Sequence, residues 1–141
     1  MLYYFVIVGV ILLVVLALSI LVHFLEKIQI RKKADRFFAG REPLTDYAFH
    51  SRYFREQKSH PDLTAKVRRI LKEECNIDPR VVPHDRIDQV ANVLNIDGMD
   101  LVELVMRLEE EFGISINDAE AGSCTTFVDI YDMVMRKVAI K

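Results

Sequence analysis

Carboxylates and thiols are the side chains of this chain whose chemistry would matter most, and their spacing argues against a catalytic centre. Glu109, Glu110 and Glu111 are adjacent, but they have no partner histidine, no nucleophile and no glycine-rich loop beside them. Cys75 and Cys124 stand 49 positions apart, so they form neither a Cys-x-x-Cys pair nor a zinc-ligand set. We therefore expect no enzyme, no catalytic residue and no metal site.

The charges of the 141 residues are divided between two parts of the chain. From Glu26 to Lys72 there are thirteen basic and six acidic residues, whereas Asp85 to Gly122 has two basic and ten acidic. The net charges are +7 and −8. This split excludes a uniformly basic nucleic-acid-binding protein, and two cysteines exclude a disulfide-stapled secreted domain.

The first 25 residues are predicted to form a transmembrane helix. Leu2 to Val22 contains no charged side chain, and sixteen of its 21 residues are Leu, Ile, Val or Phe. A helix of this length is roughly 31 Å long, enough to cross a hydrocarbon core of about 30 Å. A cleaved signal peptide is the alternative, but the run lacks a basic start and a small-x-small cleavage site.

The charges that follow this run predict its direction in the membrane. Six basic residues come soon after the apolar run, and none precedes it: Lys27, Arg31, Lys32, Lys33, Arg36 and Arg41. By the positive-inside rule we expect a single-pass protein of the cell membrane with its C-terminal part in the cytoplasm.

Residues 26–61 are predicted to be a basic, partly helical connector rich in aromatic side chains. Six of the thirteen aromatic residues of the chain lie here, namely Phe37, Phe38, Tyr47, Phe49, Tyr53 and Phe54. Thr45 or Asp46 can cap a short helix that runs toward Gln57. Rings among cations suit an anionic membrane interface, but the same rings can pack on the following domain. Both alternatives stay open.

Residues 62–141 are predicted to be a small all-helical bundle. Asp62 can cap a helix with an apolar stripe, and residues 76–95 are expected to be irregular because of Pro79 and Pro83. Asp97 can cap a second helix that ends at Gly113. Residues 118–122 are predicted to form a short turn capped by Asp118 and ended by Gly122, and Thr126 with Asp129 opens a last helix as a capping box. The fold class is all-α, a four-helix bundle preceded by one transmembrane helix and the connector.

The second of these helices resembles that of a known family. The residues Asp97-Gly98-Met99-Asp100-Leu101-Val102-Glu103-Leu104-Val105-Met106 and Leu108-Glu109-Glu110-Glu111-Phe112 are similar to the pattern D-S-L-D-x-V-E-L-V-M-x-L-E-E-E-F of acyl carrier proteins. Ile77-Asp78-Pro79 and Thr125-Thr126-Phe127-Val128-Asp129 resemble two further family motifs. The resemblance implies a four-helix bundle whose acidic second helix docks on basic patches of partner proteins.

One position departs from this family pattern. Carriers attach phosphopantetheine to the serine of D-S-L, and Gly98 occupies that position here. Glycine has no oxygen to form the phosphodiester, so the sequence predicts no phosphopantetheine and no cofactor.

The surface of the second helix is what the sequence retains. We expect a basic protein partner to bind a set of exposed acidic and apolar residues: Met99, Asp100, Val102, Glu103, Met106, Glu110 and Glu111. The leading hypothesis is a membrane-anchored, non-catalytic adaptor. The alternatives are an acyl carrier modified at an unexpected residue and a structural accessory subunit of a membrane complex. Anionic lipid at the connector is a further possible partner, and nucleic acid is not expected.

Overall fold

The computed structural model describes residues 2–55 and 61–140, and over these residues the chain is helical. The only β-type pairing among them is an isolated bridge between Arg86 and Thr126. The all-α fold class is therefore confirmed. The elements, in chain order, are α1 (Leu2–Phe37), α2 (Asp46–Tyr53), α3 (Pro61–Cys75), α4 (Ile87–Leu94), α5 (Gly98–Phe112), α6 (Asp118–Ser123) and α7 (Phe127–Ala139).

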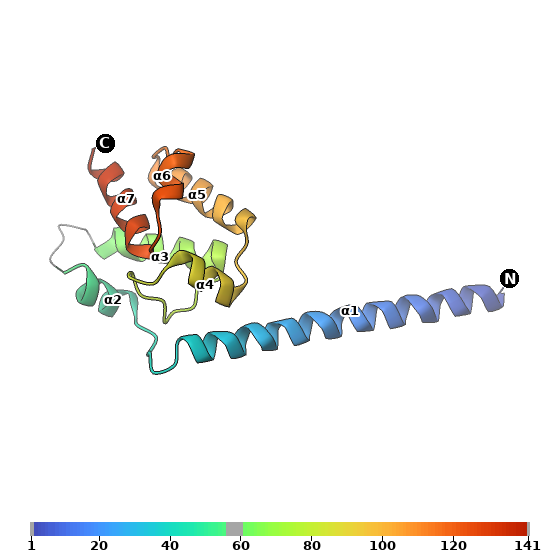
Figure 1. Ribbon diagram of the computed structural model, residues 1–141. Helices are drawn as coiled ribbons and strands as arrows, with labels where there is room; N and C mark the ends of the chain where they lie inside the picture. The colour runs from blue at the N-terminus through green and yellow to red at the C-terminus, as the bar shows by residue number, and fades with distance from the viewer. Residues whose placement is uncertain (1, 56–60, 141) are drawn as a thin grey trace.

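Helix α1 is a single continuous helix of 36 residues that leaves the bundle as an isolated rod (Figure 1). It continues twelve residues beyond Leu25, so the first part of the predicted connector is an extension of the apolar helix. Its apolar part is long enough to cross a membrane, and none of that part is buried within the protein. The helix stops before Gly40, whose φ of 77° is left-handed, and residues 41–45, which include Pro43, are not helical.

The aromatic side chains of the connector pack on the bundle. Phe38, Phe49 and Phe54 are almost completely buried, whereas Tyr47 is 81% exposed. The centroid of the Phe54 ring lies 5.0 Å from that of Tyr131 on α7, and the centroid of the Phe49 ring lies 5.8 Å from it. Of the two alternatives for these rings, packing on the domain is therefore the one the structure shows.

Ion pairs hold the connector in the same place. Arg80 donates to Asp35 of α1 at 3.1 Å and to Asp78 at 2.7 Å, and its guanidinium lies over the ring of Phe38. Arg41 donates to Asp85 at 2.7 Å. The Arg41–Asp85 pair is partly buried and the Arg80–Asp35 pair is exposed, and both join the end of α1 or the residues just after it to the segment that precedes α4.

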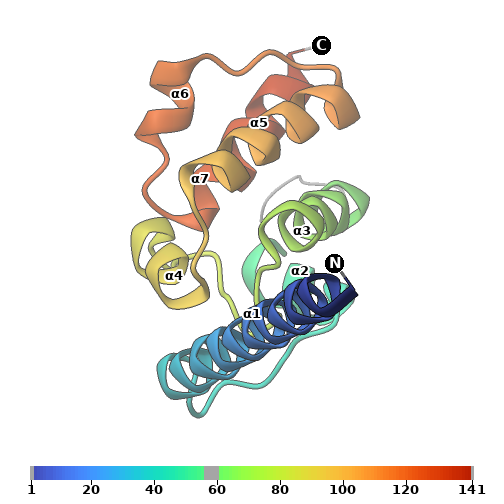
Figure 2. The same cartoon turned by 90° about the vertical axis from the view of Figure 1, so that its right-hand side faces the viewer.

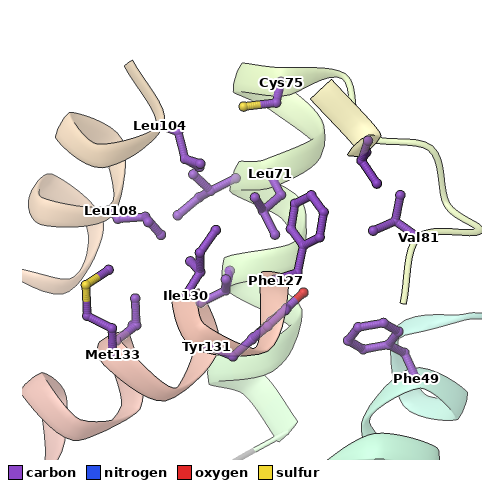
Figure 3. Packing of buried hydrophobic residues seen from close by; sticks show 14 of the residues in the cluster. Phe49, Leu71, Cys75, Val81, Leu104, Leu108, Phe127, Ile130, Tyr131 and Met133 are labelled. Carbon is purple, nitrogen blue, oxygen red and sulfur yellow. The ribbon is translucent and has the colours of Figure 1, made fainter. Parts of the chain in front are cut away.

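The bundle has one hydrophobic core, formed mainly by α3, α5 and α7 (Figure 3). Helix α3 contributes Val67, Ile70 and Leu71, which recur at the spacing of one helix face. Helix α5 adds Leu104 and Leu108. Helix α7 contributes five fully or nearly buried residues: Phe127, Ile130, Tyr131, Met133 and Val134.

Helix α4 corrects the prediction that residues 76–95 are irregular throughout. Ile87–Leu94 is helical, Val90 is fully buried, and α4 packs against the end of α1. Its N-cap, Arg86, makes no side-chain capping bond, and Asn95 ends the helix in a left-handed conformation. The sequence lacked the usual start signal, and packing on α1 and on the core supplies the stabilisation instead.

The caps predicted for α5 and α7 agree with the structure, whereas those predicted for α3 and α6 differ. Asp62, which was expected to cap α3, is the second residue of that helix. Asp97 caps α5, Gly113 ends it at φ 60°, and Thr126 with Asp129 forms the capping box of α7. The short helix α6 is capped by Asn117, one residue before the expected Asp118. Asn117 accepts from the amide of Glu120, which satisfies a free helix-end donor.

Replacing Phe54 by alanine tests how much the bundle depends on the connector. We expect Phe54→Ala to lower the free energy of unfolding by about 3–5 kcal/mol, because a buried ring is lost and a cavity remains. Urea unfolding of the full chain in detergent micelles, followed by circular dichroism, measures this. Tyr47→Ala, in the same segment but exposed, is the matched control and should change the value by less than about 0.5 kcal/mol. Equal effects would show that the connector does not support the bundle.

Candidate functional site

The start of α5 is fixed by a reciprocal capping box. The Asp97 carboxylate accepts from the amides of Met99 at 2.7 Å and Asp100 at 3.1 Å, and the Asp100 carboxylate accepts from the amide of Asp97 at 2.9 Å. Gly98 is the first helical residue. A Cβ added to Gly98 would meet no atom within 4 Å, so the fold does not require glycine there.

One face of α5 is apolar and open to solvent. Met99, Val102 and Met106 are 65%, 52% and 62% exposed, and they recur at intervals of three and four residues. Leu104 and Leu108, on the opposite side of the helix, are buried in the core. The predicted set of apolar contact residues therefore lies on one surface, which we call the outer face of α5.

The acidic residues of α5 differ in how far they are available to a partner. Glu111 faces α3 and pairs with Lys66 at 3.2 Å and Arg69 at 3.3 Å. Glu110 pairs with Arg107 at 2.7 Å on the same helix, and Asp100 is engaged in the capping box. Among the described residues, Glu103 has no ion-pair partner, and it is exposed between Met99 and Met106 on the outer face.

The pKa values of two groups near α5 differ from their ordinary values. The hydrogen bond from Lys66 holds the pKa of Glu111 below its ordinary value, with Arg69 and Arg107 acting in the same direction. Burial raises the pKa of the Cys75 thiol to about 12, and the nearby carboxylates of Asp100, Glu74 and Glu103 add to the shift. Cys75 is therefore a protonated, buried packing residue, because only a thiolate is an effective nucleophile or metal ligand.

A mainly apolar cavity of about 490 Å³, open to solvent on one side, lies between α5, α6 and α7. Its size falls within the range of small-molecule sites in proteins. Exposed residues of α5 and α6 contribute to it, namely Val102, Met106, Asp118 and Gly122. The interior is lined by apolar side chains: Leu101, Val105, Ile116, Ala121, Ile130 and Met133. An extended hydrocarbon group suits such a lining better than a polar ligand does.

Comparisons with known proteins match the part of the chain that contains this site. Residues 65–134 match the family described as "Phosphopantetheine attachment site". An acyl carrier protein of Thermosynechococcus vestitus is 42% identical over 79 residues, which is 55% of this chain and 94% of that protein. The chain belongs to the acyl carrier protein family.

Two further acyl carrier proteins are similar over the same part of the chain. That of Buchnera aphidicola is 30% identical over 55% of this chain and 96% of its own length, and that of Thermotoga maritima 31% identical over 57% and 96%. A crystal structure of an acyl carrier protein from Thermotoga maritima covers 60% of this chain and 96% of its own, at 26% identity and a TM-score of 0.48.

The prediction that no phosphopantetheine is expected is contradicted by these matches. The matching family is defined by phosphopantetheine attachment, and all three relatives are acyl carrier proteins. The comparisons therefore point to phosphopantetheine as the prosthetic group of this domain. They also agree with a chain that is not itself an enzyme, because acyl carrier proteins are carriers rather than catalysts.

The residues at the start of α5 do not fit this group. Phosphopantetheine is joined to carriers through a hydroxyl oxygen, and no residue from Gly98 to Phe112 has a hydroxyl. The hydroxyls nearest α7 are already hydrogen-bonded. Ser123 donates to the carbonyl of Glu120, and both Thr125 and Thr126 donate to Asp129. The prosthetic group to which the family points and the residue at position 98 therefore disagree.

The cavity is the part of the site that sequence reasoning missed. Its walls come from α5, α6 and α7, and Ile87 of α4 also lines it. The signal in the sequence was weak: Ile116 before α6 and Ala121 within it are apolar, and nothing in their spacing indicates a pocket. Only the packing of these helices shows that their side chains leave a cavity.

The ion pairs of Glu111 predict a dependence of stability on pH. Because the folded-state pKa of Glu111 is lowered, its stabilising contribution is present above the ordinary pKa of about 4.3 and is lost as the pH falls through the folded-state value. We expect Glu111→Gln to reduce the difference in urea midpoint between neutral and acidic pH. Glu103→Gln, on the same helix, is the control. An unchanged pH dependence in Glu111→Gln would show that the pairs with α3 contribute nothing.

Proposed function

We propose that this chain holds an acyl-carrier domain at a membrane surface, where the outer face of α5 binds a partner protein. The observation that carries the proposal is the uncovered apolar helix. From Tyr3 to Leu25, every large hydrophobic side chain of α1 is exposed to about two-fifths or more of its surface. Such an area is unstable in water, and a bilayer is the solvent that suits a helix of this length.

The basic residues after the apolar run support a cytoplasmic location for the bundle. Lys27, Arg31, Lys32, Lys33 and Arg36 are exposed on α1, and none of them has an ion-pair partner among the described residues. Cations in this position retain the flanking segment on the cytoplasmic side. The same residues remain available to anionic lipid headgroups, which attract juxtamembrane cations.

The outer face of α5 supports a role as an interaction module. Three exposed apolar side chains lie beside the unpaired carboxylate of Glu103, and the capping box fixes the helix that presents them. Methionine adapts to different contact shapes, so Met99 and Met106 suit a surface that binds another protein. A basic partner would complement Glu103 and Glu110.

The cavity favours a second candidate, a carrier that shelters an acyl chain between α5, α6 and α7. Its apolar lining and volume suit a hydrocarbon chain. This candidate requires an attachment residue other than Gly98. The two candidates share the fold and the membrane anchor, and they differ in whether the chain carries an acyl group.

Anchoring is tested by extraction. Membranes from cells that express the full chain are expected to retain it after washing with alkaline carbonate, which removes peripheral proteins. A variant that begins at Glu26 should appear in the soluble fraction. Release of the full chain by carbonate would contradict the transmembrane assignment of α1.

The role of position 98 is tested by intact mass. We propose that Gly98 occupies the attachment position. Gly98→Ser, co-expressed with a phosphopantetheinyl transferase, is then expected to be heavier by one phosphopantetheine than the natural chain treated identically, because the added side chain meets no neighbour. Met99→Ser is the matched control, one residue along the helix, and should gain no mass.

The mass of the natural chain separates the two candidates. A phosphopantetheine adduct supports the carrier, and its absence supports the interaction module. An unmodified Gly98→Ser variant would show that the transferase does not recognise this helix.

A further inference from the structure

A second cavity lies where the connector meets the bundle, and we call it the connector cavity. Its volume is about 290 Å³, and it is partly open to solvent. Its walls come from several parts of the chain, among them Leu44 and Phe49 of the connector, Leu71 of α3, Val81 of the loop between α3 and α4, and Tyr131 of α7. In Figure 2 the connector with α2 lies on the side of α3 away from α5, so this cavity is separate from the one beside α5. The volume is at the lower end of the range for small-molecule sites, so only a small ligand would fit.

The hydroxyl of Tyr131 lines this cavity without a hydrogen-bond partner among the described residues. Tyr131 is only 2% exposed. Its ring extends from α7 so that the hydroxyl points toward the space between Phe127 and Phe49 (Figure 3). The large majority of buried polar side-chain atoms in proteins are hydrogen-bonded, either to protein or to ordered water. The hydroxyl therefore indicates that the cavity holds a molecule that pairs with it.

The surroundings of Tyr131 favour an acceptor as this partner. Burial raises the pKa of Tyr131 above its ordinary value, so the hydroxyl keeps its proton and can donate it in a hydrogen bond. The guanidinium of Arg68 acts on this pKa in the opposite direction, because a positive charge stabilises negative charge nearby. Arg68 is fixed in place, since it donates to the carbonyl oxygens of Leu44 at 2.7 Å and Pro79 at 3.0 Å. An oxygen that carries negative charge suits this position.

One cation at the cavity is left without a partner. Four other charged side chains line the cavity, and each is already in an ion pair: Asp46, Arg68, Arg69 and Asp78. Lys72 also lines it, is exposed, and has no ion-pair partner among the described residues. Lys72 follows Arg68 by four positions, which places both side chains on one face of α3. The cavity therefore has an excess of positive charge on its α3 side.

We propose that the connector cavity binds a small carboxylate with an apolar body. The Tyr131 hydroxyl would donate to a carboxylate oxygen, and Lys72 would supply the counter-charge. The apolar body would contact the rings of Phe49 and Phe127 and the side chains of Leu71 and Val81. The proposal does not depend on the proposed anchoring of α1 or on any group carried at position 98.

Such a ligand would also couple binding to the docking of the connector. Leu44 and Phe49 belong to the connector, whereas Tyr131 and Lys72 belong to the bundle, so the complete site exists only while the two are packed together. A molecule that binds only this state stabilises it in proportion to its occupancy. The ligand would therefore strengthen the contact that holds α1 against the bundle.

Binding is tested by titration calorimetry of the full chain in detergent micelles, with micelles alone as the blank. Phenylacetate is the probe, and it is expected to bind saturably at one site, whereas the neutral phenylacetamide should bind at least several-fold more weakly. Tyr131→Phe removes only the hydroxyl and should weaken phenylacetate binding about tenfold or more, because hydrogen bonds to charged groups are strong. Tyr53→Phe, a half-buried tyrosine of α2 that does not line the cavity, is the matched control and should have no effect.

The counter-charge is tested with Lys72→Gln in the same assay. The affinity for phenylacetate should fall several-fold, while Lys32→Gln, an exposed lysine of α1 outside the cavity, should leave it unchanged. No saturable binding of phenylacetate, or equal affinities of Tyr131→Phe and the natural chain, would show that the cavity holds only water and would overturn the proposal. Equal binding of phenylacetamide, or no effect of Lys72→Gln, would overturn the assignment of a carboxylate ligand.

Urea unfolding gives a readout that a merely structural tyrosine would not produce. Without ligand, Tyr131→Phe should unfold at a urea midpoint no lower than that of the natural chain, because the hydroxyl it removes has no partner in the fold. Saturating phenylacetate should raise the midpoint of the natural chain and leave that of Tyr131→Phe nearly unchanged. A lower midpoint of Tyr131→Phe without ligand would show that the hydroxyl already serves the fold and would overturn the proposal.

Discussion

The docking of an aromatic connector on a helical bundle is the contact on which the rest of this structure depends. Phe38 and Phe54 are buried, and Arg80 joins the ring of Phe38 to the carboxylates of Asp35 and Asp78. Without these contacts, α1 would be a tether that leaves the bundle free to turn. With them, one rigid body extends from the apolar helix to the outer face of α5, so the direction of that face is a property of the fold.

The helices with a side-chain cap and an apolar stripe could be predicted from sequence. Asp97 and Thr126 each begin a helix in the structure as they were expected to, because capping depends on residues a few positions apart. Helix α4 could not be predicted in this way. It has no side-chain cap, it follows two prolines, and it is held by packing on the end of α1, which is distant in sequence. The location of the aromatic side chains of the connector could not be predicted either, because aromatic rings among basic residues suit a membrane interface and aromatic rings also pack in protein cores.

The candidate site could likewise be predicted only where it depends on residues close together in the sequence. Helical periodicity alone places Met99, Val102 and Met106 on one exposed face. It does not show that Glu111 is bound to α3, because Lys66 and Arg69 lie forty or more positions away. Nor does it show the cavity, whose volume depends on how α6 closes over α5 and α7. Sequence reasoning thus identified which apolar residues of α5 are exposed together, and the structure distinguished the acidic residues that have ion-pair partners from Glu103.

At position 98 the family has a serine and this chain a glycine, and the fold does not explain the difference. Glycine is often retained where a positive φ or a close neighbour excludes a side chain, but Gly98 has neither constraint. Asp97 caps α5 through backbone amides that any residue at position 98 would leave in place, and Leu104 and Leu108 bury the other side of the helix. The fold is therefore indifferent to the side chain at position 98. The exposed residues of the outer face of α5 therefore keep their positions whichever side chain stands at position 98, and the proposed interaction surface does not depend on the attachment residue.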